Sequence, residues 1–254
     1  MDNFFDNEDD ITKWLHNLFI FEFTIRKDLT VDVPNHVYLS SQLDILEYFP
    51  VQFGVINGSF HCNNLNLSSL KGAPYEVEGD FDCSSNKLIS LEYAPSIVHK
   101  DFNCSYNLLT SLKGCPKNIG EHFCCHFNQL TTLEHGPQEV IGNFLCGDNL
   151  LKNVKGCPEK IYGHFICPNN KITTFDGFPI KVCDMLNIRG NPIPEQELLS
   201  FTTEVFGDIY HSFGETKEDF LNTIELVKVK HDHKELDSLL KHNNNQQNII
   251  KRRI

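Results

Sequence analysis

The chain has 254 residues, enough for one large domain or two small ones, and its composition of 40% hydrophobic and 11% aromatic residues excludes a disordered protein. Its 34 acidic and 22 basic residues leave a net charge of -12, so we expect neither nucleic acid nor an anionic membrane as a partner. No apolar run is long enough to span a membrane, and the acidic start is unlike a signal peptide. We therefore expect a cytoplasmic protein whose ten cysteines are reduced.

Residues 1–59 are predicted to form an N-terminal cap. Segment 11–20 carries apolar side chains at helical spacing, which predicts a short amphipathic helix. The alternating runs within 21–33 predict a β-hairpin, and 37–56 is typical of a degenerate first repeat. Because the ends of a repeat array expose its core, we expect this helix, hairpin and repeat to close one end.

Residues 60–194 contain an internal repeat of 21 residues. The phenylalanine column is Phe60, Phe81, Phe102, Phe123, Phe144 and Phe165. The cysteine column, two residues later, is Cys62, Cys83, Cys104, Cys125, Cys146 and Cys167. The asparagine column is Asn86, Asn107, Asn128, Asn149, Asn170 and Asn191, and proline and leucine columns share the period. A unit this short cannot close its own core, so the units must stack into a solenoid.

Within each unit, the alternation predicts one short strand. Phe81 and Cys83 are two residues apart and point to one face, while Asp80, Asp82 and Ser84 point to the other. Successive strands would form a parallel sheet with phenylalanine and cysteine inside. An inward thiol beside an inward phenylalanine is expected to be a small core residue and not a metal ligand.

The asparagine column is predicted to satisfy backbone groups in the turn after each strand. A tight turn leaves N–H and C=O groups without sheet partners, and a buried carboxamide both donates and accepts hydrogen bonds. Stacked units would therefore form an asparagine ladder.

The order of columns, for example from Phe81 to Pro95, resembles the leucine-rich repeat family, with phenylalanine and cysteine in two strand leucine positions. The 21-residue unit is similar to short bacterial repeats of that family and resembles a group found in bacteriophage genomes. The resemblance implies an α/β-type repeat solenoid with short parallel strands on a concave face, non-helical convex connections and helical caps at both ends. The pattern departs from the family before each strand, where the apolar residue (Val77, Val98) lies four and not three positions ahead of phenylalanine.

The segment after the repeats is predicted to be the second cap. Three-residue and four-residue apolar spacing within 195–241 indicates three short helices, at 195–206, 217–227 and 233–241. Residues 242–254 are polar, low in complexity and basic at their end, which predicts a disordered tail.

The outward positions of successive strands change from unit to unit while the inward columns stay constant, which favours a surface that binds another protein. The predicted partner-binding residues are His61, Asp80, Asp82, Asp101, Asn103, His122, Cys124, His126, Asn143, Leu145, His164, Ile166, Asn187 and Arg189. Acidic side chains gather on the second and third units, and imidazole and apolar groups follow. We therefore expect a partner with a basic patch beside an apolar one.

Two alternatives remain open. One is a structural or assembly role through the caps. The other is a metal or small-ligand site near His122, Cys124 and His126, although same-face residues of a straight strand diverge too far for one tetrahedral ion. Enzyme motifs are missing from the sequence, so we expect a non-enzymatic protein without a cofactor. The resemblance implies that a phage encodes it and that it acts in the host cytoplasm.

Overall fold

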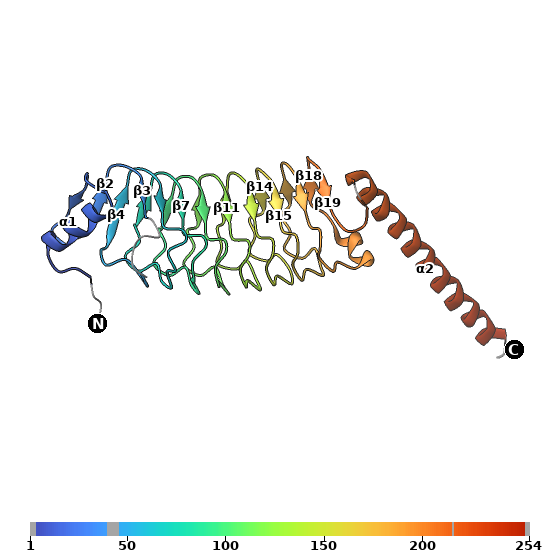
Figure 1. Cartoon of the computed structure of the whole chain (residues 1–254). Helices are drawn as coiled ribbons and strands as arrows, with labels where there is room; N and C mark the ends of the chain where they lie inside the picture. Colours follow the sequence, from blue (N-terminus) through green and yellow to red (C-terminus); the bar gives the residue numbers. More distant parts are fainter. Residues whose placement is uncertain (1–3, 40–45, 215, 252–254) are drawn as a thin grey trace.

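The computed structural model describes residues 4–39, 46–214 and 216–251, and part of the predicted N-terminal cap and the last three residues of the predicted tail lie outside them. It shows a regular parallel β-solenoid of about eight turns with a 21-residue spacing (Figure 1). The turns stack along an axis that is nearly straight in the plane of the view. The predicted solenoid is confirmed.

Each turn contributes two short strands, where the sequence analysis expected one. In one turn these are β6 (Glu76–Val77) and β7 (Phe81–Asp82), separated by a bend at residues 78–80. The apolar residue four positions ahead of phenylalanine is therefore the inward residue of a second strand, and Val77 is fully buried. The spacing that departs from the leucine-rich pattern is the room needed for the bend between the two strands.

The two strands of each turn belong to different sheets. The strands of sheet B are β3 (Val37–Tyr38), β5 (Phe60–His61), β7, β9 (Phe102–Asn103), β11 (Phe123–Cys124), β13 (Phe144–Leu145), β15 (Phe165–Ile166), β17 (Leu186–Asn187) and β19 (Ile209–Tyr210). Sheet A contains β1 (Thr24–Ile25), β2 (Val31–Val33), β4 (Phe53–Ile56), β6, β8 (Ile97–Val98), β10 (Asn118–Ile119) and β12 (Glu139–Val140). Sheet C continues beyond it with β14 (Lys160–Ile161), β16 (Lys181–Val182) and β18 (Glu204–Val205).

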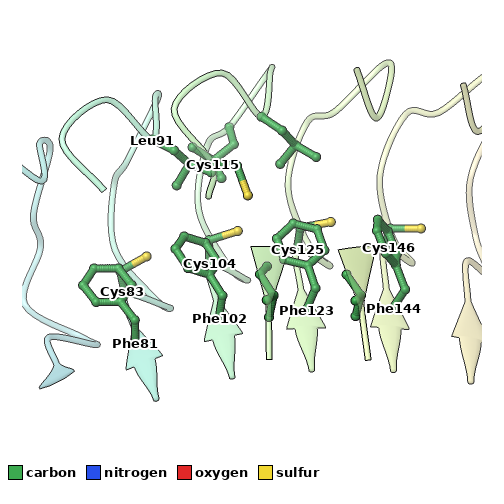
Figure 2. Packing of buried hydrophobic residues seen from close by; sticks show 14 of the residues in the cluster. Phe81, Cys83, Leu91, Phe102, Cys104, Cys115, Phe123, Cys125, Phe144 and Cys146 are labelled. Carbon is green, nitrogen blue, oxygen red and sulfur yellow. The ribbon is translucent and has the colours of Figure 1, made fainter. Parts of the chain in front are cut away.

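The core consists of the inward columns stacked in register. Phe81 pairs with Phe60 on one side and Phe102 on the other, and all three rings are fully buried. The rings of Phe81 and Phe102 stack with centroids 5.4 Å apart, whereas those of Phe123 and Phe144 meet edge-on at 5.0 Å. Figure 2 shows these four rings in successive turns with a cysteine sulfur beside each ring. The six periodic cysteines are free thiols and fully buried, as predicted.

The asparagine ladder is confirmed as well. Asn107 donates through Nδ2 to the carbonyls of Cys83, Cys104 and Ser105 at 3.0–3.2 Å. Its Oδ1 accepts the N–H of Leu88, one turn earlier, at 2.9 Å. One side chain thus satisfies backbone groups of two adjacent turns, which fixes both the turn and the stacking of the units.

At the N-terminal end, α1 (Glu8–Asn17) matches the predicted helix in its apolar residues. Asn7 accepts the N–H of Asp10 at 2.9 Å as the N-cap, and Ile11 and Leu15 are buried against the solenoid core. The predicted hairpin is present, since β1 pairs antiparallel with β2.

The C-terminal end differs from the prediction of three short helices. A 3₁₀ helix, η1 (Glu195–Ser200), is followed by β18 and β19, which form a further solenoid turn, and then by one long helix, α2 (Lys217–Lys251). Phe220 on α2 is fully buried, so the start of α2 caps the last turn. The helix then runs away from the solenoid and includes much of the segment expected to be disordered (Figure 1). Among the described residues, no helix combines the length and apolar character needed to cross a membrane.

Candidate binding surface

The outward side chains of sheet B form one continuous central column. Strand register places the equivalent residue of each turn beside the next across the whole sheet. In order, the column is Tyr38, His61, Asp82, Asn103, Cys124, Leu145, Ile166, Asn187 and Tyr210. Seven of its members are among the predicted partner-binding residues, and Tyr38 and Tyr210 extend it at both ends. The structure therefore brings these seven residues together in a single row.

The central column changes character along the solenoid axis. At its N-terminal end Tyr38 stacks on His61 with centroids 4.8 Å apart, and Nδ1 of His61 lies 3.9 Å from Oδ2 of Asp82. Cys124, Leu145 and Ile166 then place three apolar side chains in succession, all partly exposed. The column offers a polar, acidic part and an adjoining apolar part, as the sequence predicted.

A second column, one residue ahead of phenylalanine, is a ladder of hydrogen-bond acceptors. In each rung a side-chain atom accepts the backbone N–H of the equivalent residue one turn later. The rungs are His36 Nδ1 to Ser59 (2.9 Å), Ser59 Oγ to Asp80 (3.1 Å), Asp80 Oδ1 to Asp101 (3.3 Å), Asp101 Oδ1 to His122 (2.8 Å), His122 Nδ1 to Asn143 (2.9 Å), Asn143 Oδ1 to His164 (2.8 Å) and His164 Nδ1 to Met185 (3.3 Å).

Five of the predicted partner-binding residues belong to this acceptor ladder, so they stabilise the stacking of adjacent turns. Their variation between acidic, amide and imidazole groups had favoured a binding role, but every member is a short side chain that presents an acceptor at a similar distance from its backbone. The bend between the two sheets leaves the N–H of this position without a sheet partner, and the ladder supplies one. The signal was readable in the sequence as a column of acceptors. The members concerned are Asp80, Asp101, His122, Asn143 and His164.

Cys124 and His126 contribute contact area more than reactivity. Burial, together with the nearby carboxylates of Asp101 and Asp82, raises the pKa of the Cys124 thiol to about 12. Burial lowers the pKa of His126, opposed by Asp148. A protonated thiol is a weak nucleophile, and a neutral imidazole is a weakly polar contact.

The alternative metal site does not gather the three residues it named. Among the described residues, the clusters whose possible ligand atoms lie within 4.8 Å of one another are Asp101 with Glu121 and His122, and Glu76 with Glu78 and His99. His122 is in one of them, without Cys124 or His126. Its Nδ1 already accepts the N–H of Asn143 in the acceptor ladder.

The two-sheet turn differs from the single-strand unit that the leucine-rich repeat resemblance implies. No family model, curated protein or solved structure matches the chain. The geometry establishes a parallel solenoid with a 21-residue repeat, and the leucine-rich repeat type stays a prediction.

An exposed aromatic pair that was not predicted from the sequence lies beside the central column. Tyr106 and Phe127 follow the strands β9 and β11 at equivalent positions of adjacent turns, and their rings stack with centroids 4.4 Å apart. His126 meets both rings edge-on at 5.3 and 5.5 Å. The detectable signal was two aromatic residues in a column that otherwise holds small or polar ones.

Proposed function

We propose that this chain is a non-enzymatic protein-binding module that engages a partner protein through the central column of sheet B. The observation that supports it is the contrast between the two sides of the same strands. The inward side repeats phenylalanine and cysteine through the full repeats, whereas the central column changes from turn to turn. Its polar members Asp82, Asn103 and Asn187 accept the N–H two residues ahead in their own turn, unlike the acceptor ladder, which links one turn to the next. The proposal includes a repeat of the short leucine-rich type, encoded by a phage, with a host or virion protein as the partner.

The central column favours a partner with a basic patch beside an apolar one. Asp82 lies in the polar part of the column, and Cys124, Leu145 and Ile166 lie in the apolar part. A basic group opposite Asp82 would gain charge complementarity, and an apolar group opposite Leu145 would bury both surfaces. The net charge of -12 adds long-range attraction for such a partner.

Site-directed photocrosslinking tests this proposal. A photoreactive phenylalanine analogue at Leu145 should crosslink the partner in cells that produce the protein, while the same analogue at Ile97, exposed on the outer face of sheet A, should not. Leu145→Glu should weaken the partner's affinity about 30-fold, since truncated or charged anchors in an interface cost about 2 kcal/mol. Ile97→Glu is the matched control and should leave the affinity unchanged. Crosslinks from Ile97 alone, or equal affinity of both variants, would refute the proposal.

An assembly role through the C-terminal helix is the second candidate, because α2 carries exposed apolar side chains. Leu221, Leu226 and Val229 are 45%, 54% and 51% exposed on the part of α2 next to the solenoid. Crosslinks of the chain to itself along α2, with none from Leu145, would favour that role over partner binding through sheet B.

A further inference from the structure

The turn after each sheet B strand from β5 to β17 has a left-handed residue four positions after the first residue of the strand, and this column differs sharply between turns. In five turns its member is Asn64, Ser85, Asp148, Asn169 or Gly190, all with φ between 53° and 70°. These are small or polar residues, and asparagine, aspartate and glycine are the residues that adopt this conformation most readily. In the third and fourth full repeats the same position holds Tyr106 (φ 54°) and Phe127 (φ 51°). The chain itself thus shows which residues the turn favours, and two adjacent turns depart from them.

The fold does not compensate for the two aromatic residues by burying them. A bulky residue in the left-handed region costs about 1 kcal/mol or more relative to glycine or asparagine. Tyr106 remains 51% exposed and Phe127 43% exposed, so each ring keeps much of its surface in water. What the pair gains is mutual stacking, with an interplanar angle of 14°. An exposed pair of stacked rings held on a rigid turn is a feature that ligand recognition explains better than stability does.

The surroundings of the pair indicate which chemistry it would recognise. His126 is the third aromatic member, and Asp148 occupies the next position of the left-handed column. Asp148 acts on His126 as a nearby negative charge, while its Oδ1 accepts a hydrogen bond from Asn169 at 3.0 Å. No lysine or arginine occupies this column. An aromatic face beside a carboxylate suits a planar cation, since a guanidinium can stack on the rings and pair with the carboxylate.

We propose that Tyr106 and Phe127, with His126 and Asp148 at their edge, form an aromatic platform that anchors an arginine side chain of the partner protein. This inference rests on the proposed function and names one contact of the same interface. The partner's arginine would stack on the face of Phe127 that points away from Tyr106, on the side of Asp148, and its adjoining apolar side chains would reach Cys124 and Leu145 of the central column. Arginine is favoured over lysine because the ammonium group lacks a planar face for stacking.

The first test separates a recognition role from a structural one by measuring stability. The double variant Tyr106→Asn and Phe127→Asn places at both turns the residue that neighbouring turns already use. We expect its free energy of unfolding to be unchanged or higher by about 1 kcal/mol in urea denaturation, because asparagine relieves the left-handed strain. A loss of more than about 1 kcal/mol would show that the pair serves the fold, and would overturn the inference.

The second test measures binding with three short peptides that alternate leucine with arginine, lysine or glutamate. In NMR titrations of the full chain, the arginine peptide should shift the amide signals of Tyr106, Phe127 and His126. The double asparagine variant should bind it about fivefold more weakly, and the lysine peptide should also bind the unsubstituted chain more weakly. Ser85→Asn, in the same column but outside the platform, should bind the arginine peptide like the unsubstituted chain.

Three results would contradict the aromatic platform: equal binding of the arginine peptide by the double variant, equal binding of the glutamate peptide, or tighter binding of a neutral oligosaccharide at the same signals. The failure of this inference is distinguishable from failure of the proposed function. If the double variant still crosslinks its partner from Leu145 with unchanged affinity, the platform is refuted and the binding surface on sheet B stands. If Leu145 yields no partner crosslink while the arginine peptide still binds at the platform, the broader proposal fails instead.

Discussion

Raising the pH from about 8 to about 10 under reducing conditions should unfold this protein. Eight thiols have a pKa raised above the ordinary value of 9.0, chiefly because they are buried. They are Cys62, Cys83, Cys104, Cys115, Cys124, Cys125, Cys146 and Cys157. In the unfolded chain these thiols would ionise near pH 9, whereas in the folded chain they stay protonated. The folded state therefore binds more protons above pH 9, and its stability falls as the pH rises.

The size of the effect follows from the number of thiols. Below pH 8 the thiols of the unfolded chain are protonated as well, so their ionisation does not lower the free energy of unfolding. At pH 10 each unfolded thiol gains about 1.4 kcal/mol from ionisation, and eight of them together gain about 11 kcal/mol. That sum is comparable with the whole stability of a typical domain, about 5–15 kcal/mol. Circular dichroism across the pH range, with a phosphine reductant present, measures the transition.

A triple alanine variant is the control for the alkaline transition. Replacing Cys83, Cys104 and Cys125 with alanine removes three titrating groups and should reduce the loss of stability between pH 8 and pH 10 by about 4 kcal/mol. The variant should start less stable at pH 7, since each substitution leaves a small cavity. A stability that is constant from pH 8 to pH 10 in the unsubstituted chain would mean that the thiols are not buried.

Replacing Asn107 with leucine should lower the free energy of unfolding by about 3–5 kcal/mol. The substitution leaves the buried N–H of Leu88 without a partner, which costs about 1–3 kcal/mol. The carbonyls of Cys83, Cys104 and Ser105 each lose one of two hydrogen bonds, which adds to that cost. The expected loss of unfolding free energy is large for a single substitution, because Asn107 bonds to backbone groups of its own turn and of the preceding turn.

Urea denaturation of Asn107→Leu beside Asn118→Leu measures this effect. Asn118 lies exposed on the outer face of sheet A, so its replacement should change stability by less than about 0.5 kcal/mol. Equal effects of the two substitutions would contradict the asparagine ladder. A loss confined to Asn107 would support it.

The inward columns could be predicted because a strict period constrains them twice. Phe81 and Cys83 must alternate along one strand and must also match Phe102 and Cys104 in the next turn. Few arrangements satisfy both conditions. The second strand was harder to predict because β6 is only two residues long and has a single inward residue, Val77, which leaves no alternation to detect.

The C-terminal turn was mistaken for helix because its residues fit two patterns. Leu198, Phe201 and Val205 have helical spacing, yet Val205 lies in β18 and pairs with Val182. Ile209 takes the place of the periodic phenylalanine, pairing with Leu186 in sheet B. Tertiary pairing with the preceding turn decided the outcome, and that pairing leaves no local trace once the phenylalanine and cysteine columns end.

For the candidate surface, the sequence predicted which side chains point outward but not which of them form hydrogen bonds between turns. Alternation correctly placed Leu145 and Ile166 outward, because their neighbours Phe144 and Phe165 are core residues. It could not separate an outward side chain that is free from one that accepts a hydrogen bond from the next turn, such as His122. That distinction depends on the bend between the two sheets, which the sequence analysis did not foresee.

Alkylation of the native protein, followed by mass spectrometry of each cysteine, tests most directly whether every turn lays its periodic thiol into a common dry core. Cys124 and Cys125 are adjacent, and the structure turns the first outward and buries the second completely. We expect the partly exposed Cys183 to react first and Cys124 later because of its raised pKa, with Cys125 and the other five periodic thiols reacting only as fast as the protein unfolds. Reaction of the periodic thiols as fast as Cys183, in protein that circular dichroism shows to be folded, would contradict the inward register from which the binding surface follows.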